Sequence, residues 1–201
     1  MPEPTRTMSE AVQTTLGSSW YLRPMEMWKT ARMSSPAGDL CLARSAKGLV
    51  RLEFRDRVQK FDSKRVTLQE SPKTLAACMS ELHEYFAGKR RDFSVPLDLR
   101  GRDFQIQCWR ALLGIPYGET RTYADIARAI GHPNAFRAVG LANNRNPIAI
   151  IVPCHRVIAS DGTLCGYGGG LDLKRKLLEM EGAPLRDGTN LFSCVRETVG
   201  A

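Results

Sequence analysis

Two short helical segments joined by a tight turn constrain the fold of this chain more than any other feature. Residues 123–130 and 135–144 have helical spacing, and the sequence Gly131-His132-Pro133-Asn134 separates them. A glycine and a proline within four residues end the first helix and turn the chain sharply into the second. The pattern predicts either a helix-turn-helix or an ordinary helical hairpin, and spacing alone does not separate the two.

A short apolar run follows these helices. After Asn146-Pro147, residues 148–152 read Ile-Ala-Ile-Ile-Val, and Pro153-Cys154-His155-Arg156 comes directly after them. We expect the run to lie in the core and to hold Cys154 rigidly at the edge of that core. His155 and Arg156 supply a proton acceptor and positive potential, which a thiol nucleophile needs. The alternative interpretation of a Cys-His pair is a packed structural cysteine.

The first half of the chain is typical of a small α/β unit. Leu40 and Leu42 alternate with other residues, and a second apolar stretch follows at 49–54, which predicts a β-hairpin. Helical spacing over 72–86 predicts a helix that begins at a proline and ends at Gly88.

The second half contains further helical patterns around the apolar run. Amphipathic spacing predicts helices at 104–113 and 173–180, and a glycine-rich loop lies at 162–170. The predicted fold class is therefore α+β. The expected parts are an N-terminal extension at 1–30, a small α/β domain at 31–98, a mostly helical domain at 99–183 that contains the helix-turn-helix and Cys154, and a C-terminal tail at 184–201.

Composition excludes several classes of protein. The 201 residues are 43% hydrophobic and 25% charged, which is ordinary for a globular protein rather than a disordered one. No run approaches the roughly 18 apolar residues of a membrane span, and no apolar signal segment is present, so we expect a cytoplasmic protein. Six cysteines without a CxxC pair and only three histidines favour reduced thiols, and we expect neither a metal site nor a cofactor.

Positive charge is concentrated in the middle of the chain. Residues 100–156 contain eight arginines, no lysine and three acidic residues, which leaves 8 − 3 = +5 of the formal net charge of +8. Arginine presents a planar fork that suits phosphate groups. A solvated basic face is the alternative interpretation.

The order of the motifs resembles that of the O6-alkylguanine-DNA alkyltransferase family, also called the methylated-DNA–protein-cysteine methyltransferases. The match covers nearly all of residues 104–182 in one unbroken order, and residues 35–54 resemble the more divergent N-terminal domain of that family. The matching residues are Ile115 to Thr120, Tyr123, Arg137 to Gly140, Asn146-Pro147, Pro153 to Val157, Gly166-Tyr167, Gly169 to Leu171 and Glu181.

The resemblance implies a suicide repair reaction. Cys154 would take the alkyl group from O6 of guanine. Alkyl groups on O4 of thymine are a second predicted substrate. His155 would accept the thiol proton through a water molecule, and Glu181 would orient that histidine. Tyr123 would donate a hydrogen bond to the guanine ring and stabilise guanine as the leaving group. It would also bend the 3′ phosphate away. For Glu181 the alternative is a solvated carboxylate, and for Tyr123 it is core packing.

The resemblance also implies a DNA partner that is read from the minor groove, with the damaged base flipped out of the duplex. Arg137 would enter the base stack, whereas Ala138 and Gly140 would permit close approach to the groove. Ser160 is a weaker candidate for a phosphate contact. The alternative for Arg137 is a surface contact to phosphate.

The resemblance further implies a base pocket that is lined by Val157, Tyr167 and Gly168, with Asn146 bracing the turn before the cysteine. Some relatives have a serine at the position of Gly168. The smaller glycine would widen the pocket. Some members hold a structural zinc in the N-terminal domain, but Ser45 and Val50 stand at the matching positions, so no metal is predicted.

Three classes of protein compete for this sequence. A repair transferase acts once on duplex DNA and is expected to be a monomer. The sequence does not decide whether such monomers bind cooperatively along DNA. A helix-turn-helix regulator binds a specific sequence as a dimer and is indifferent to Cys154→Ser. A non-catalytic relative binds alkylated DNA but lacks the nucleophile, and the presence of Cys154 counts against it. The transferase is the predicted function.

Overall fold

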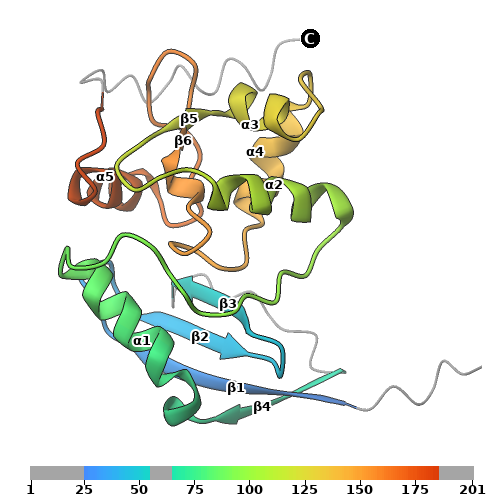
Figure 1. Ribbon diagram of the computed structural model, residues 1–201, viewed down its shortest axis with the longest axis vertical. Helices are drawn as coiled ribbons and strands as arrows, with labels where there is room; N and C mark the ends of the chain where they lie inside the picture. Colours follow the sequence, from blue (N-terminus) through green and yellow to red (C-terminus); the bar gives the residue numbers. More distant parts are fainter. Residues whose placement is uncertain (1–24, 55–64, 186–201) are drawn as a thin grey trace, which may run out of the picture.

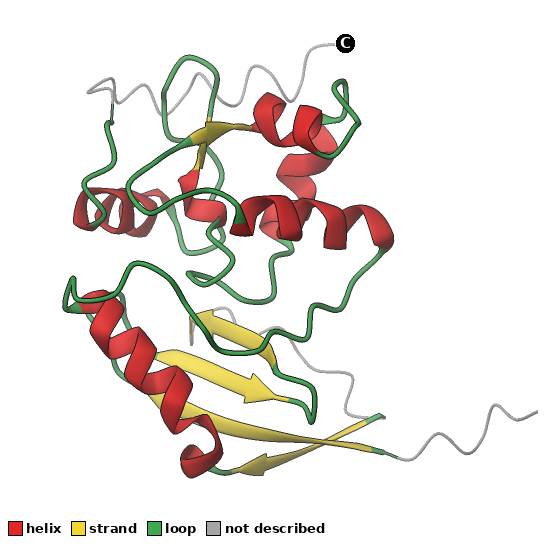
Figure 2. Cartoon of the chain, viewed as in Figure 1, coloured by secondary structure: helices red, strands yellow, loops and turns green. Residues whose placement is uncertain are grey.

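A four-stranded sheet forms the N-terminal part of the molecule (Figures 1 and 2). The computed structural model describes residues 25–54 and 65–185. The strands lie in the order β3-β2-β1-β4, with β1 antiparallel to β2 and parallel to β4. Their bounds are Glu26–Met33 for β1, Leu40–Arg44 for β2, Leu49–Phe54 for β3 and Val66–Glu70 for β4.

Side chains on one face of this sheet form part of the core. Ala31, Leu42 and Leu52 are paired neighbours on β1, β2 and β3, and all three are buried. Helix α1 (Pro72–Phe86) packs against β1, begins with its proline in the first turn and buries Tyr85. The predicted hairpin and the predicted helix are thus both present.

The first strand begins earlier than the sequence analysis expected. Residues 1–30 were assigned to an extension, but β1 already starts at Glu26, and Trp28 packs with Ala43 and Val50. Lys29 and Thr30 interrupt the apolar alternation, so the period of two that marks a half-buried strand is weak here. Residues 1–24 lie outside the described residues.

The second part of the molecule is mostly helical (Figure 2). Helices α2, α3 and α4 pack against one another, and the Nε1–H of Trp109 on α2 donates to the Ala142 carbonyl on α4 at 2.9 Å. Gly131 has a φ of +77° in the turn between α3 and α4, a conformation that glycine adopts without steric cost. The bounds are Asp103–Leu113 for α2, Tyr123–Ala129 for α3, Phe136–Asn144 for α4 and Leu171–Met180 for α5, with a short parallel pair β5 (Arg121–Thr122) and β6 (Val157–Ile158).

The apolar run at 148–152 joins the two parts. It is buried but is not a strand: the Leu52 N–H donates to Pro147 and the Ala149 N–H donates to Leu52, at 2.9 and 2.8 Å. Ile150 has a φ of 71° and is the only non-glycine residue with a positive φ in the described ranges. This strained turn lies in the middle of the run and redirects the chain towards Cys154 at the edge of the core.

One hydrophobic cluster combines residues of the sheet and of the helices, so the two parts share a continuous core. Within residues 25–54 and 65–185, none of the helices has the length and apolar character that a membrane crossing requires.

Candidate active site

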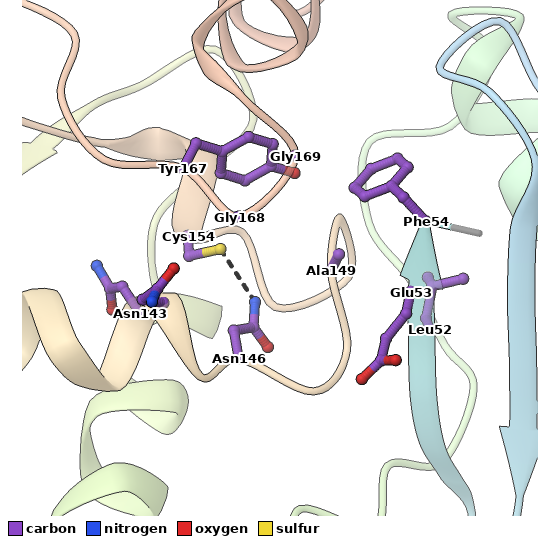
Figure 3. Close-up of a pocket in the computed structure, with 11 residues that line it drawn as sticks. Leu52, Glu53, Phe54, Asn143, Asn146, Ala149, Cys154, Tyr167, Gly168 and Gly169 are labelled. Carbon is purple, nitrogen blue, oxygen red and sulfur yellow. Dashed lines mark hydrogen bonds between the residues drawn. The ribbon is translucent and has the colours of Figure 1, made fainter. Parts of the chain in front are cut away.

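Cys154 is the first residue of a short 3₁₀ helix, η2 (Cys154–Arg156), and its exposed fraction is 7%. Its Sγ accepts a hydrogen bond of 3.1 Å from Nδ2 of Asn146 (Figure 3). Burial raises the pKa of the Cys154 thiol, whereas the Asn146 hydrogen bond and the charge of Lys174 act in the opposite direction. The resting group is therefore a protonated thiol that needs a base before it can act as a nucleophile.

Asn146 also ties together the two ends of the buried run. Its Nδ2 donates to the Val152 carbonyl at 2.7 Å, and its Oδ1 accepts from the Ile148 N–H at 3.0 Å. One side chain thus contacts the start of the run, its end and the sulfur of Cys154.

His155 lies fully buried beside Cys154, and its Nε2 is 2.9 Å from Oε1 of Glu181. Burial lowers the pKa of His155 more than its carboxylate partner raises it, so the ring is neutral at neutral pH. We assign the Nε2–H as the donor to Glu181, which leaves Nδ1 as a proton acceptor. Nδ1 has no hydrogen-bond partner among the described residues.

Glu181 is the centre of a buried network at the end of α5. Its carboxylate accepts from Nε and Nη2 of Arg156 at 2.8 and 3.0 Å and from the Tyr85 hydroxyl at 2.6 Å, in addition to His155. Burial alone raises the pKa of Glu181, but the hydrogen bonds from His155 and Arg156 outweigh it and lower the pKa to about 2. An ionised carboxylate is therefore held against a neutral imidazole.

Acid is expected to destabilise the protein through Glu181. Its pKa is about 2 in the folded protein against an ordinary 4.5, so its stabilisation is complete above pH 4.5 and is lost as the pH falls towards 2. The lost stabilisation corresponds to about 3 kcal/mol. Urea unfolding of the wild type and of Glu181→Gln between pH 6 and 3 measures this loss, which the variant should lack. Equal pH dependence in both proteins would contradict the assignment.

Apart from Ser160, the residues predicted to bind DNA lie on α3 and α4. Arg137 is exposed in the first turn of α4, its guanidinium carbon lies 5.9 Å from the ring centroid of Phe136, and Ala138 is half-buried. Tyr123 begins α3 and donates from its hydroxyl to the Cys165 carbonyl at 3.2 Å. Gly140 faces the Tyr123 ring: a Cβ there would lie 3.7 Å from it. The two short helices therefore bring Tyr123 and the middle of α4 to neighbouring positions.

A pocket of about 230 Å³ opens over Cys154 and lies between the sheet and the helical part (Figure 3). Strand β3 supplies one wall, and the loop that carries Tyr167 and Gly168 supplies another. The lining residues are Leu52, Glu53, Phe54, Asn143, Asn144, Asn146, Ala149, Cys154, Tyr167, Gly168 and Gly169.

Two predicted residues lie elsewhere. Val157 is fully buried and does not line this pocket, and its carbonyl accepts a hydrogen bond from the buried ammonium group of Lys174. Ser160 is exposed in the loop after β6. Ser45, at the position of a zinc ligand in some relatives, donates instead to Asp98 at 2.6 Å. Within the described part of the chain, no group of three or more histidine, cysteine or acidic residues is placed to hold a metal ion.

Sequence reasoning missed three polar residues of this region, Tyr85, Lys174 and Asn143, and did not foresee the contacts of a fourth, Arg156. Tyr85, Arg156 and Lys174 contact the site from within the core, and Asn143 lines the pocket. Tyr85 repeats at helical spacing with the apolar residues of α1, so no signal distinguishes it from an ordinary core residue. Arg156 was noted as a source of positive potential, but its hydrogen bonds to Glu181 depend on the fold.

Comparisons with known proteins agree with this geometry. The profile of the 6-O-methylguanine DNA methyltransferase DNA-binding domain matches residues 103–183, and that of the ribonuclease-like domain of the same protein matches 29–99. A Mycobacterium bovis protein named methylated-DNA–protein-cysteine methyltransferase is 52% identical over 149 residues, which are 74% of this chain and 89% of that protein.

Solved structures show the same relationship. A crystal structure of Mycobacterium tuberculosis O6-methylguanine methyltransferase has a TM-score of 0.69 and 48% identity, and covers 84% of this chain and 100% of its own. A structure of M. tuberculosis OGT in complex with DNA has a TM-score of 0.68 and 48% identity. The match covers 79% of this chain and 95% of that chain. Both family profiles and relatives near 50% identity thus agree: this chain belongs to the 6-O-methylguanine DNA methyltransferase family.

Proposed function

We propose that this chain repairs O6-alkylguanine in duplex DNA by moving the alkyl group to Cys154, once per molecule. One observation carries the proposal: Cys154 lies in an open pocket beside a neutral, buried His155 that an ionised Glu181 holds in place. This is the arrangement of nucleophile, base and orienting carboxylate that activates a thiol. No cofactor enters the reaction.

In the proposed reaction the thiol proton of Cys154 passes through a water molecule to Nδ1 of His155, whose ring becomes an imidazolium stabilised by Glu181. The sulfur lone pair forms the S–C bond, and the O6–C bonding pair remains on O6. The guanine anion takes a proton from solvent, which restores guanine. A return step would have to break the S–C bond of the thioether and expel the Cys154 thiolate, which is a poor leaving group, so no return step follows and each molecule acts once.

The proposed DNA contact is the exposed start of α4, which carries Arg137. O6 is reached when the base leaves the duplex, at a cost of a few kcal/mol. Arg137 would fill the vacated place from the minor groove, and Tyr123 would meet the extruded nucleotide. The protein is proposed to act inside the cell as a monomer, and O4-alkylthymine is a second proposed substrate.

The stoichiometry of repair tests this function. A duplex with one O6-methylguanine is incubated with increasing protein, and the restored guanine is measured by chromatography of the digested DNA. We expect one guanine restored per protein chain and no further turnover. Cys154→Ser should restore none, whereas Cys41→Ser, which changes a thiol on the sheet, should behave as the wild type. Repeated turnover by the wild type would refute the single-use reaction.

Gly168 is expected to widen the range of alkyl groups that the protein can transfer to Cys154. It lines the pocket, and a Cβ at this position would have no heavy atom within 4 Å, so the Cβ of Gly168→Ser is added without a clash. The added atoms take space from a large substituent but not from a methyl group. We expect the ratio of benzyl to methyl transfer rates to fall about tenfold, an effect of about 1.4 kcal/mol. Equal ratios in the two proteins would exclude this role.

A further inference from the structure

Tyr85 is a buried residue of the N-terminal part whose hydroxyl reaches the candidate active site. It lies near the end of α1, beside the sheet (Figure 1), with an exposed fraction of 0%. Its hydroxyl donates to Oε1 of Glu181, in the helical part, at 2.6 Å. The same Oε1 lies 2.9 Å from Nε2 of His155. One carboxylate oxygen is therefore shared by the base of the proposed reaction and by a residue of the N-terminal part.

Aromatic neighbours fix the direction of this hydroxyl. The ring centroid of Tyr85 lies 5.3 Å from that of Phe86 and 5.4 Å from that of Phe93. The Tyr117 ring meets it nearly edge-on, at 6.1 Å and an interplanar angle of 83°. Packing on several sides locks a side chain into one rotamer. The hydroxyl is therefore directed at Glu181 before any substrate binds.

A donor at this oxygen has a chemical consequence for the proposed proton transfer. When His155 takes the thiol proton, the imidazolium can either keep its Nε2 proton or pass it to Glu181, which would cancel both charges. A hydrogen bond donated to a carboxylate favours its ionised form. The bond from Tyr85 therefore helps to keep the proton on His155 and the negative charge on Glu181, where that charge stabilises the imidazolium.

Tyr85 remains a donor throughout such a reaction. Burial and the negative charge of Glu181 both raise the pKa of Tyr85, so its hydroxyl is protonated at neutral pH. Arg156 also binds the carboxylate, with Nε on Oε2 at 2.8 Å and Nη2 on Oε1 at 3.0 Å. Oε1 thus meets hydrogen-bonding groups of Tyr85, His155 and Arg156, and of these three residues Tyr85 alone belongs to the N-terminal part.

We propose that Tyr85 is a positioning residue for alkyl transfer: its hydroxyl holds Glu181 in place and keeps it ionised, so that the N-terminal part of the chain helps to activate Cys154. The proposal rests on the proposed function. Tyr85 is not among the residues that line the pocket over Cys154, so it acts through Glu181 and His155 rather than on the substrate. The bonds that form and break are those of the proposed reaction.

Tyr85→Phe tests this role, because it removes one oxygen atom and keeps the ring that packs in the core. Single-turnover rates are measured with an O6-methylguanine duplex over a range of protein concentrations in excess of the duplex. We expect the maximal rate to fall about tenfold, because a hydrogen bond to a charged group is lost. The protein concentration that gives half the maximal rate should stay unchanged, because Tyr85 is buried and lines no part of the pocket.

Tyr117→Phe is the matched control. It removes the hydroxyl of the neighbouring tyrosine, which donates to the Met180 carbonyl at 3.1 Å rather than to Glu181. This variant should keep the maximal rate within about twofold of the wild type. A wild-type maximal rate in Tyr85→Phe would overturn the inference. An equal fall in both variants would also overturn it, because disturbed packing around the two rings would then explain the effect.

A probe that is not a DNA lesion separates this inference from the function on which it rests. Iodoacetamide alkylates free thiols, and peptide mass spectrometry follows its reaction with Cys154 and, as an internal reference, with the half-buried Cys41. Tyr85→Phe should slow the alkylation of Cys154 about tenfold and leave that of Cys41 unchanged. An unchanged rate at Cys154 would overturn the inference. Absence of methyl transfer in the wild type would instead contradict the proposed function, and the iodoacetamide rates would still decide whether Tyr85 helps to activate the thiol.

Discussion

Glu181→Gln is expected to slow alkyl transfer by about 10²–10³-fold and to lower the free energy of unfolding by about 3 kcal/mol. The amide removes the negative charge that stabilises a protonated His155, so proton transfer from the thiol becomes less favourable. It also leaves Arg156 buried and without its charged partner. Apart from residue 181, the acceptor for Arg156 is the Ile115 carbonyl at 2.6 Å. Activity and stability should therefore fall together.

Single-turnover rates with an O6-methylguanine duplex and urea unfolding at pH 7 measure the two effects. Glu179→Gln is the matched control, because Glu179 lies exposed in the last turn of α5, close to Glu181 in the chain. The substitution removes the same charge as Glu181→Gln. The control should change either quantity little. A Glu181→Gln protein with a wild-type rate would remove the carboxylate from the mechanism.

Arg137→Ala is expected to slow the repair of duplex lesions by about 10–100-fold, because the proposed stacking of Arg137 in place of the extruded base would be lost and flipping costs a few kcal/mol. The side chain is exposed and makes no contact with the pocket, so the unfolding free energy should change by less than about 0.5 kcal/mol. The chemistry at Cys154 should also be intact.

A substrate without DNA separates these effects. Transfer from the free base O6-benzylguanine needs no flipping, so Arg137→Ala and the wild type should react with it at similar rates. Arg32→Ala removes an equally exposed arginine from the sheet and should leave duplex repair unchanged. Equal loss on the free base and on the duplex would place Arg137 in the chemistry rather than in base flipping.

Most of the fold could be predicted from local sequence signals. Pro72 and Gly88 delimit α1, because proline is favoured in the first turn of a helix and glycine just after its end. Gly131-His132-Pro133-Asn134 separates α3 from α4, because glycine and proline close together interrupt helical structure. The α+β class and the family are confirmed. Strand β1 was not predicted, because its apolar alternation is broken by Lys29 and Thr30 and its pairing partners, β2 and β4, lie elsewhere in the chain.

The candidate site was predictable only where the family motifs name its residues. Cys154, His155, Asn146 and Glu181 lie in one connected region, although their roles stay predictions. Tyr85 reaches Glu181 from 96 positions away, through a helix of the N-terminal part. Such a contact depends on how the two parts share a core, which periodicity within one helix does not encode.

Peptide mass spectrometry after reaction with an O6-methylguanine duplex tests the central claim most directly. The account predicts one added methyl group per chain, located on the peptide that contains Cys154 and absent from Cys154→Ser. The reduced, folded protein should reach this mass at one equivalent of lesion and then change no further. A methyl group on another residue would contradict the assignment of Cys154 as the acceptor. No mass change at all would contradict the transfer reaction itself and would leave a protein that binds damaged DNA without repairing it.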